Sequence, residues 1–226
     1  SLKNCDMANL SQVIVRRAAI VEILTRACDK NLAMQAVAEG VRRKDEQIIH
    51  NIVFPMPKDR QDVSDHDIWL LSEEYHYYDY IASDIPLANI KWNDGEAVFE
   101  SDIDQKFQDL LARRADDNSG KRPDIALFSK EGSAIIVEFK APGVSTDEHI
   151  GDLTEYAHLL AAKSGGKLRK FYGYLIGDTV NNLRLGGSWT PFPTGNGWFQ
   201  SSQLMDPVTR QLLGETYFEI LHFRDV

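Results

Sequence analysis

Three polar side chains interrupt an otherwise apolar stretch in the middle of the chain. Asp124 precedes the apolar run 125–128, and Glu138 and Lys140 lie at the end of a second run, 134–139. Residues two apart on a strand share a face, so Glu138 and Lys140 point the same way. If Asp124 opens the first strand of a hairpin, two carboxylates and an ammonium group converge at one end of a strand pair.

Two neighbouring carboxylates raise each other's pKa unless a positive charge lies between them. A divalent cation with oxygen ligands meets this need, which favours Mg²⁺ or Mn²⁺ as the cofactor. Asp124 and Glu138 are the expected ligands, and the backbone carbonyl of Phe139 is a further one. Lys140 would hold a water molecule or stabilise the developing phosphate charge. Together these groups predict phosphodiester hydrolysis.

Pro123-Asp124 followed by Glu138-x-Lys140 resembles the motif of the PD-(D/E)XK nuclease superfamily. The likeness covers about half of the chain, because the predicted hairpin is followed by a helix and a further strand, in the order of the family's core. The resemblance implies an α/β fold with a restriction-endonuclease-like α/β/α core and a mixed central sheet. It also implies that the Asp and Glu bind the metal and that the Lys positions the attacking water.

The resemblance implies further residues around the metal. Such nucleases often carry a Glu on the helix before the hairpin, for which Glu73 is the first candidate and Glu74 and Glu46 are secondary ones. Each of these is equally well interpreted as a surface carboxylate. In related enzymes the helix after the hairpin often carries a Gln-x3-Tyr pattern, and here Asp152 and Tyr156 occupy those positions. Asp152 is either a further metal-side carboxylate or a surface residue, since an ionised carboxylate donates no hydrogen bond.

A second likeness lies in the stretch from Ile48 to Asp84. It resembles a domain at the C-terminal end of some prokaryotic histidine-kinase-like ATPase proteins, and Shedu-type defence nucleases are a looser likeness. This implies a nuclease domain used in prokaryotic defence and gated by an ATPase domain or subunit.

The chain is acidic, with a formal net charge of −9 over 226 residues. This balance argues against a general nucleic-acid-coating protein, which would be basic, but it does not exclude a nuclease with local contacts. The densest basic cluster of the chain comprises Lys163, Lys167, Arg169 and Lys170. It is predicted to flank the carboxylates and to bind phosphates. An equal interpretation is that these residues form a solvated loop whose positive charges complement the C-terminal end of a helix dipole.

Two features bear on the compartment. No apolar run is long enough to span a bilayer and no signal peptide is visible, so no membrane partner is expected. The two cysteines, Cys5 and Cys28, form no metal or disulfide pattern, which favours a reduced, cytoplasmic protein.

The chain is predicted to divide into a helical lead, 1–44, and a nuclease-like domain, 45–226. The lead either connects to a further N-terminal domain, packs on the core, or packs on a second copy in a homo-oligomer. A second helix is expected from Asp29 or Asn31 to Gly40. Glu46 and His50, one helical turn apart, are either a metal pair or, the favoured alternative, a solvated helix face. Further helices are expected at 45–54, 68–81, 104–114 and from just after Ser145, and strands at 97–99, 125–128, 134–139, 171–176, 182–185, 198–202 and 216–223.

Three functions fit these residues. The leading one is a metal-dependent nuclease, most plausibly acting on DNA. The alternative is a non-catalytic nucleic-acid-binding or regulatory module on the same fold, because fold alone does not fix function. The third is a structural domain that carries the motif by chance. The first predicts metal-dependent cleavage, the second predicts binding without cleavage, and the third predicts no metal binding.

Overall fold

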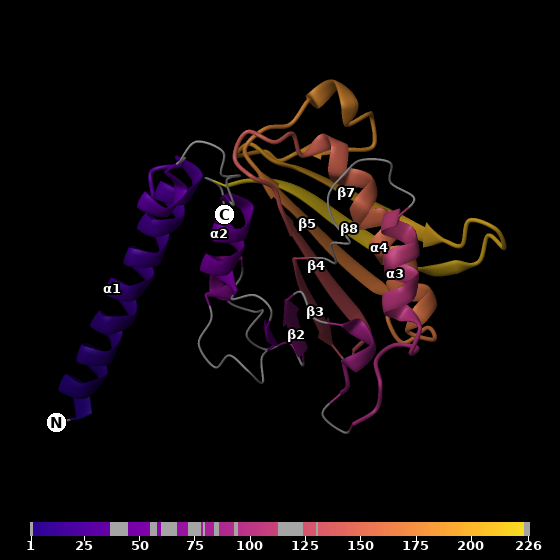
Figure 1. The fold of residues 1–226 in the computed structure, drawn as a ribbon, viewed down its shortest axis with the longest axis horizontal. Coiled ribbons are helices and arrows are strands. Elements are labelled where there is room, and N and C mark those ends of the chain that lie inside the picture. The colour runs from indigo at the N-terminus through magenta and orange to yellow at the C-terminus, as the bar shows by residue number, and fades with distance from the viewer. Residues whose placement is uncertain are drawn as a thin grey trace.

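The structure is a computed structural model of the 226-residue chain. It describes residues 2–36, 45–54, 58–59, 67–71, 78, 80–83, 86–92, 95–112, 124–129 and 131–223. Within these residues the fold is α/β, with a mixed eight-stranded sheet in the order β1-β2-β3-β4-β5-β8-β7-β6. Helices lie on both faces of the sheet, with α1 and α2 on one side and α3 and α4 on the other (Figure 1).

The elements have the following bounds. The α-helices are α1 (Leu2–Cys28), α2 (Asp45–Val53), α3 (Ile103–Ala112) and α4 (Ile150–Lys163). The strands are β1 (Lys58–Asp59), β2 (Tyr80–Ser83), β3 (Ile125–Ser129), β4 (Ser133–Phe139), β5 (Lys170–Gly177), β6 (Thr190–Pro191), β7 (Trp198–Met205) and β8 (Leu212–His222). Short 3-10 helices are η1 (Ala33–Gln35), η2 (Ile68–Leu70), η4 (Leu87–Asn89), η5 (Asp147–His149) and η6 (Asn182–Arg184).

The topology brings three strand ends to one edge of the sheet. Strands β2, β3 and β4 form an antiparallel meander, and α4 then carries the chain back so that β5 runs parallel to β4. Strand β8 is in turn parallel to β5. The C-terminal ends of β4, β5 and β8 therefore share an edge, where ligands are commonly bound in α/β sheets.

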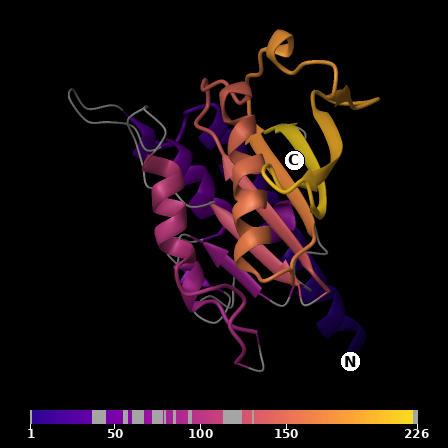
Figure 2. The same cartoon turned by 90° about the vertical axis from the view of Figure 1, so that its right-hand side faces the viewer.

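Two hydrophobic cores cover the two faces of the sheet. Along β4, Ala134 and Ile136 pack toward α4, whereas Ile135 and Val137 pack toward α2 and the end of α1. This alternation follows from the two-residue period of a strand. Figure 2 shows α4 lying across the sheet with α3 beside it. Both faces of β4 are therefore covered by helices, and this packing extends to Phe139, its last residue.

The hairpin, the helices α2 and α3 and the strands β5, β7 and β8 confirm the corresponding sequence predictions, within a few residues at their ends. The helix predicted over 68–81 is wrong: η2 is a single short turn, β2 begins at Tyr80, and residues 72–77 and 79 lie outside the described residues. Ile81 is paired with Leu127, a partner far along the chain that local periodicity does not reveal.

Four smaller predictions also differ from the structure. The strand predicted at 182–185 is the 3-10 helix η6, and Ala97 forms an isolated bridge to Lys91 rather than a strand. The second helix of the lead is only η1, and residues 37–44, including the predicted domain boundary, lie outside the described residues. Ser145 hydrogen-bonds to the Asp147 carboxylate, so η5 comes first and α4 begins later than predicted.

Candidate metal centre

Asp124 and Glu138 are buried side chains on neighbouring strands. Asp124 directly precedes β3, whose first residue, Ile125, pairs with Val137, so the next position along β4, Glu138, is level with Asp124. The backbone N–H of Phe139 donates a 2.7 Å hydrogen bond to Asp124 Oδ2. Asp124 is 8% exposed and Glu138 is 4% exposed. The predicted convergence of two carboxylates at the end of the hairpin is therefore present.

Lys140 completes the group from the residue after β4. Its Nζ lies 3.2 Å from Glu138 Oε2, and its backbone N–H donates to Ile176 O, which extends the contact between β4 and β5. Glu138 Oε1, the other carboxylate oxygen, is buried and accepts no hydrogen bond from the described residues. A buried carboxylate oxygen without a donor carries a desolvation cost that a bound cation would remove.

The pKa values of the three groups depend on one another. Burial raises the pKa of Asp124 well above its ordinary value, and the neighbouring Glu138 charge raises it further. Burial also raises the pKa of Glu138, although Lys140 opposes this effect. Burial alone would lower the pKa of Lys140, but Glu138 and Asp124 outweigh it and raise that pKa. Lys140 is therefore an ammonium group, suited to holding a water molecule or a phosphate oxygen rather than to accepting a proton.

Helix α2 supplies two further side chains. His50 is 1% exposed, its Nδ1 lies 3.6 Å from Asp124 Oδ1, and its ring stacks on Phe139 at 5.9 Å between centroids. The half-buried Glu46, one turn earlier, contributes negative charge that raises the pKa values of Asp124, Glu138 and Lys140. The structure brings Glu46 to the site, whereas Glu73 and Glu74 lie outside the described residues.

The favoured interpretation of Glu46 and His50 as a solvated face is wrong for His50, which is buried. The signal was present in the sequence, because His50 lies between the apolar residues Ile49 and Val53 on a short amphipathic helix. Helix α2 packs that apolar face against β4, which places the imidazole beside the carboxylates.

The two candidates on α4 have different surroundings. The charge of Asp152 raises the pKa of Glu138, and the Asp152 carboxylate pairs with His149 at 3.1 Å. Its side chain is 16% exposed, so Asp152 borders the site instead of standing on an open surface. Tyr156 is buried in the core between α4 and the sheet, among residues such as Leu153 and Leu160.

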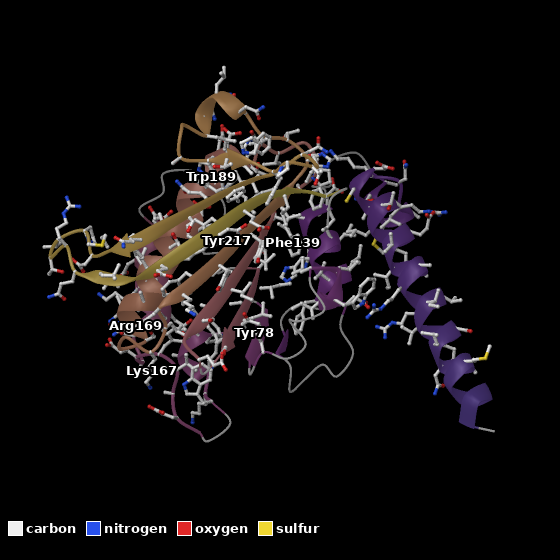
Figure 3. All side chains as sticks on the ribbon, turned by 180° about the vertical axis from the view of Figure 1, so that it is seen from behind. Tyr78, Phe139, Lys167, Arg169, Trp189 and Tyr217 are labelled. Carbon is white, nitrogen blue, oxygen red and sulfur yellow. The ribbon has the colours of Figure 1, made fainter. Side chains whose placement is uncertain are left out.

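The basic cluster of Lys163, Lys167, Arg169 and Lys170 lies at the opposite end of the sheet. Lys170 pairs with Ser133, at the start of β4, while Glu138 is near its end. Figure 3 shows Lys167 and Arg169 far from Phe139. The predicted place of this cluster beside the carboxylates is wrong, because α4 carries the chain back along the full length of the sheet.

Two members of the cluster are engaged by carboxylates. Lys163 Nζ contacts Glu100 and Asp102 at 2.8 Å each, which holds α4 to the start of α3. Lys167 Nζ contacts Glu96 at 2.6 Å. These ion pairs account for the positions of both lysines without a nucleic acid.

The site fits a hard cation held by oxygen atoms. Asp124, Glu138 and the Phe139 carbonyl belong to the end of one hairpin, and Glu138 Oε1 has no hydrogen-bond donor within the described structure. Among the described residues no three His, Cys, Asp or Glu side chains form a ready-made metal-binding cluster. A cation here would accordingly keep several water ligands, as Mg²⁺ usually does in proteins.

Comparison with known proteins gives no relative: no family model, no curated protein and no solved structure matches this chain. In the described part of the chain, no helix is long and apolar enough to cross a membrane.

Proposed function

We propose that this protein is a metal-dependent nuclease of the PD-(D/E)XK type that hydrolyses phosphodiester bonds in DNA. The observation that carries the proposal is the buried pair Asp124 and Glu138, with the ammonium group of Lys140 3.2 Å from Glu138. Burying two neighbouring carboxylates reduces folding stability unless a positive charge compensates them. A cation bound between them would supply that compensation, and perturbed carboxylates of this kind are typical of functional sites.

The order of the elements supports a restriction-endonuclease-like core. A helix, α2, precedes the antiparallel meander β2-β3-β4, and the crossover helix α4 leads to β5, parallel to β4. Asp124 and Glu138 lie level with each other at the end of the β3–β4 hairpin within this arrangement, which supports the proposal.

Each residue has a definite role in the proposal. Asp124, Glu138 and the Phe139 carbonyl would hold Mg²⁺ or Mn²⁺, and Glu46, whose charge acts on Asp124, Glu138 and Lys140, is the proposed helix carboxylate. When bound, the ion polarises the phosphate and lowers the pKa of a coordinated water. Lys140 orients the attacking water and stabilises the negative charge that develops on the phosphate.

The proposed partners follow from the resemblance in the sequence. DNA is the proposed substrate, and an ATPase domain or subunit of a prokaryotic defence system is the proposed regulator. The acidic net charge of −9 suits an enzyme that contacts phosphates through a bound cation at one site rather than through a broad basic surface.

The test is cleavage of plasmid and single-stranded DNA with Mg²⁺ or Mn²⁺, against EDTA, by the native chain and by Lys140→Ala. The matched control is Lys106→Ala, which removes an exposed lysine from α3. We expect metal-dependent cleavage by the native chain and the control, and a loss of at least about 100-fold in Lys140→Ala. Cleavage that persists in Lys140→Ala contradicts the proposed role of the lysine.

A chain that binds DNA and Mg²⁺ without cutting under any condition contradicts the catalytic proposal and favours the non-catalytic nucleic-acid-binding or regulatory module. Adding a candidate ATPase partner distinguishes that result from a nuclease that its partner activates. Absence of both metal and DNA binding would favour a structural domain.

A further inference from the structure

Helix α1 carries most of the exposed apolar side chains of the described structure. Its Met7, Leu10 and Ile14 are 68%, 60% and 58% exposed. Four more large apolar residues of α1 are exposed, and outside α1 the described chain has only five such residues. The additional four are Val13, Val15, Val21 and Ile23. Exposed apolar side chains concentrated on one helix are typical of an interface.

Only the second half of α1 is held by the rest of the described structure. Leu24 and Ala27 are buried against the core, Arg16 pairs with Asp67 at 3.2 Å, and Arg17 lies over the Trp69 ring at 4.5 Å. The first half extends away from the sheet (Figure 1). An isolated helical segment of this length is marginal in water, so packing on another surface would stabilise it.

The exposed side chains include a stripe with its own periodicity. Met7, Leu10, Ile14 and Val21 are spaced by three, four and seven residues, which are the a and d positions of a heptad repeat. The stripe continues into Leu24, which packs on the chain's own core. A helix with such a stripe is complementary to another helix with the same stripe, and a second copy of this chain provides one.

Charges on α1 are compatible with self-association. Between Met7 and Val21 the residues beside the stripe are uncharged, namely Ser11, Val13, Ala18 and Ile20, and Asp6 lies beside its first turn. Lys3 and Arg17 share the a and d spacing, and a parallel pair would place each against its own copy. An antiparallel pair keeps these like charges apart, because it joins the first half of one helix to the second half of the other.

We propose that α1 mediates homodimerisation, with two α1 helices packed antiparallel about a two-fold axis near Ile14. Met7 of one copy then lies near Val21 of the other, and the same patch is used by both subunits. The interface is distinct from the carboxylate site, so the dimer proposal is tested independently of the nuclease proposal.

The test is sedimentation velocity on the native chain and on Leu10→Glu/Ile14→Glu, which places two carboxylates in the stripe. The matched control is Ala8→Glu/Gln12→Glu, with the same charge and spacing on the opposite, exposed side of α1. We expect the native chain and the control to sediment as dimers, with twice the 25.6 kDa mass of one chain, and we expect the stripe variant to sediment as a monomer. Circular dichroism verifies that all three are folded.

Two outcomes overturn the proposal. One is a native chain that stays monomeric up to about 100 μM, where even weak self-association is detectable. The other is a stripe variant that remains dimeric, or a control variant that dissociates equally. A monomer would leave the apolar surface to a different protein or to another segment of a longer chain.

The antiparallel orientation has its own test by cysteine cross-linking, with Cys5 and Cys28 replaced by Ser. A Met7→Cys chain mixed with a Val21→Cys chain should form a mixed disulfide. Met7→Cys alone should not, because an antiparallel pair separates the two residues by about 21 Å along the axis. Efficient self-cross-linking of Met7→Cys contradicts the antiparallel arrangement.

Discussion

The backbone N–H of Phe139 donates a hydrogen bond of 2.7 Å to Oδ2 of Asp124. This bond fixes one oxygen of the carboxylate to the end of β4 and leaves Oδ1 directed toward His50. Asp124 is therefore oriented by main chain, whose position does not depend on a side-chain rotamer. Such fixed orientation is what a cation site or a catalytic site requires of its ligands.

Replacing Asp124 by Asn should stabilise the metal-free protein. The raised pKa of Asp124, caused by burial and by Glu138, means that ionisation costs folding free energy at neutral pH. The Asn side chain keeps an acceptor for the Phe139 N–H and carries no charge. We expect a gain of about 1–2 kcal/mol in EDTA, or a few degrees in Tm by calorimetry.

The control for that experiment is Asp104→Asn. Both Asp104 oxygens accept backbone N–H bonds, from Leu87 and Ala88 at 2.9 Å each. An amide can accept only one of these, so this variant should melt at a lower temperature than the native chain. A fall in Tm for both variants would show that Asp124 is not under electrostatic strain.

The metal-free protein should lose stability as pH rises from about 4 upward. Asp124 and Glu138 have raised pKa values in the folded state, so the folded chain binds more protons than the unfolded chain in this range. Their contribution to the free energy of unfolding is fully present below the pKa that they have in the unfolded chain, and it is lost as pH rises through the pKa that they have in the folded chain. Urea titrations in EDTA from pH 5 to 8 measure this, with Asp124→Asn as reference. A flatter slope in the native chain than in Asp124→Asn would contradict the assignment.

Removing the ammonium group of Lys140 should destabilise the fold more than removing the whole ion pair. Lys140→Met leaves Glu138 buried without its positive partner, at a cost of about 3 kcal/mol. Glu138→Gln/Lys140→Met removes both charges and should recover most of that loss. Equal stabilities of Lys140→Met and the double variant, by chemical denaturation, would contradict the predicted cost of leaving Glu138 unpaired.

Asp147 should be a structural carboxylate near the site. Its side chain is fully buried and accepts bonds from Ser145, the Asn181 N–H at 2.9 Å and Arg184 at 3.1 Å. Burial alone would raise the pKa of Asp147, but these bonds outweigh it and lower that pKa. Asp147→Ala should cost about 2 kcal/mol near neutral pH, and the difference should shrink as pH falls through the lowered pKa.

Glu148→Ala is the natural comparison for Asp147→Ala. Glu148 contacts the same Arg184 at 2.8 Å, but its side chain is 62% exposed. An exposed ion pair contributes little, so this variant should unfold almost as the native chain does. If Glu148→Ala lost as much stability as Asp147→Ala, the stabilising interaction would be the contact with Arg184 that both carboxylates share, and not the burial of Asp147.

The hairpin was predictable because its information is local. Ile125–Phe128 and Ala134–Phe139 are short apolar runs joined by turn residues, and the two-residue period places Glu138 and Lys140 on one face. Strand β2 was not predictable in this way, because it has only four residues and is held in place by pairing with β3, and four residues are too few to show a two-residue alternation in the sequence. In addition, Ile81 of β2 fits the helical spacing that Leu70 and Tyr77 set in the sequence.

The surroundings of the site depend on connections that local patterns do not encode. The basic residues near Lys170 follow the carboxylates in sequence, yet α4 returns the chain to the far end of the sheet before β5 begins. His50 precedes the carboxylates by a long interval, yet it packs beside Asp124 because α2 lies against β4. Distance along the chain was misleading in both cases.

The most direct test of the cation site is isothermal titration of Mg²⁺ or Mn²⁺ into the native chain, Glu138→Gln and the control Glu131→Gln. Glu131 is an exposed carboxylate in the turn of the same hairpin. We predict one saturable site in the native chain and the control, and an affinity at least about 10-fold weaker in Glu138→Gln. Absence of saturable binding in the native chain, or equal binding by Glu138→Gln, would contradict a metal centre built on Asp124 and Glu138.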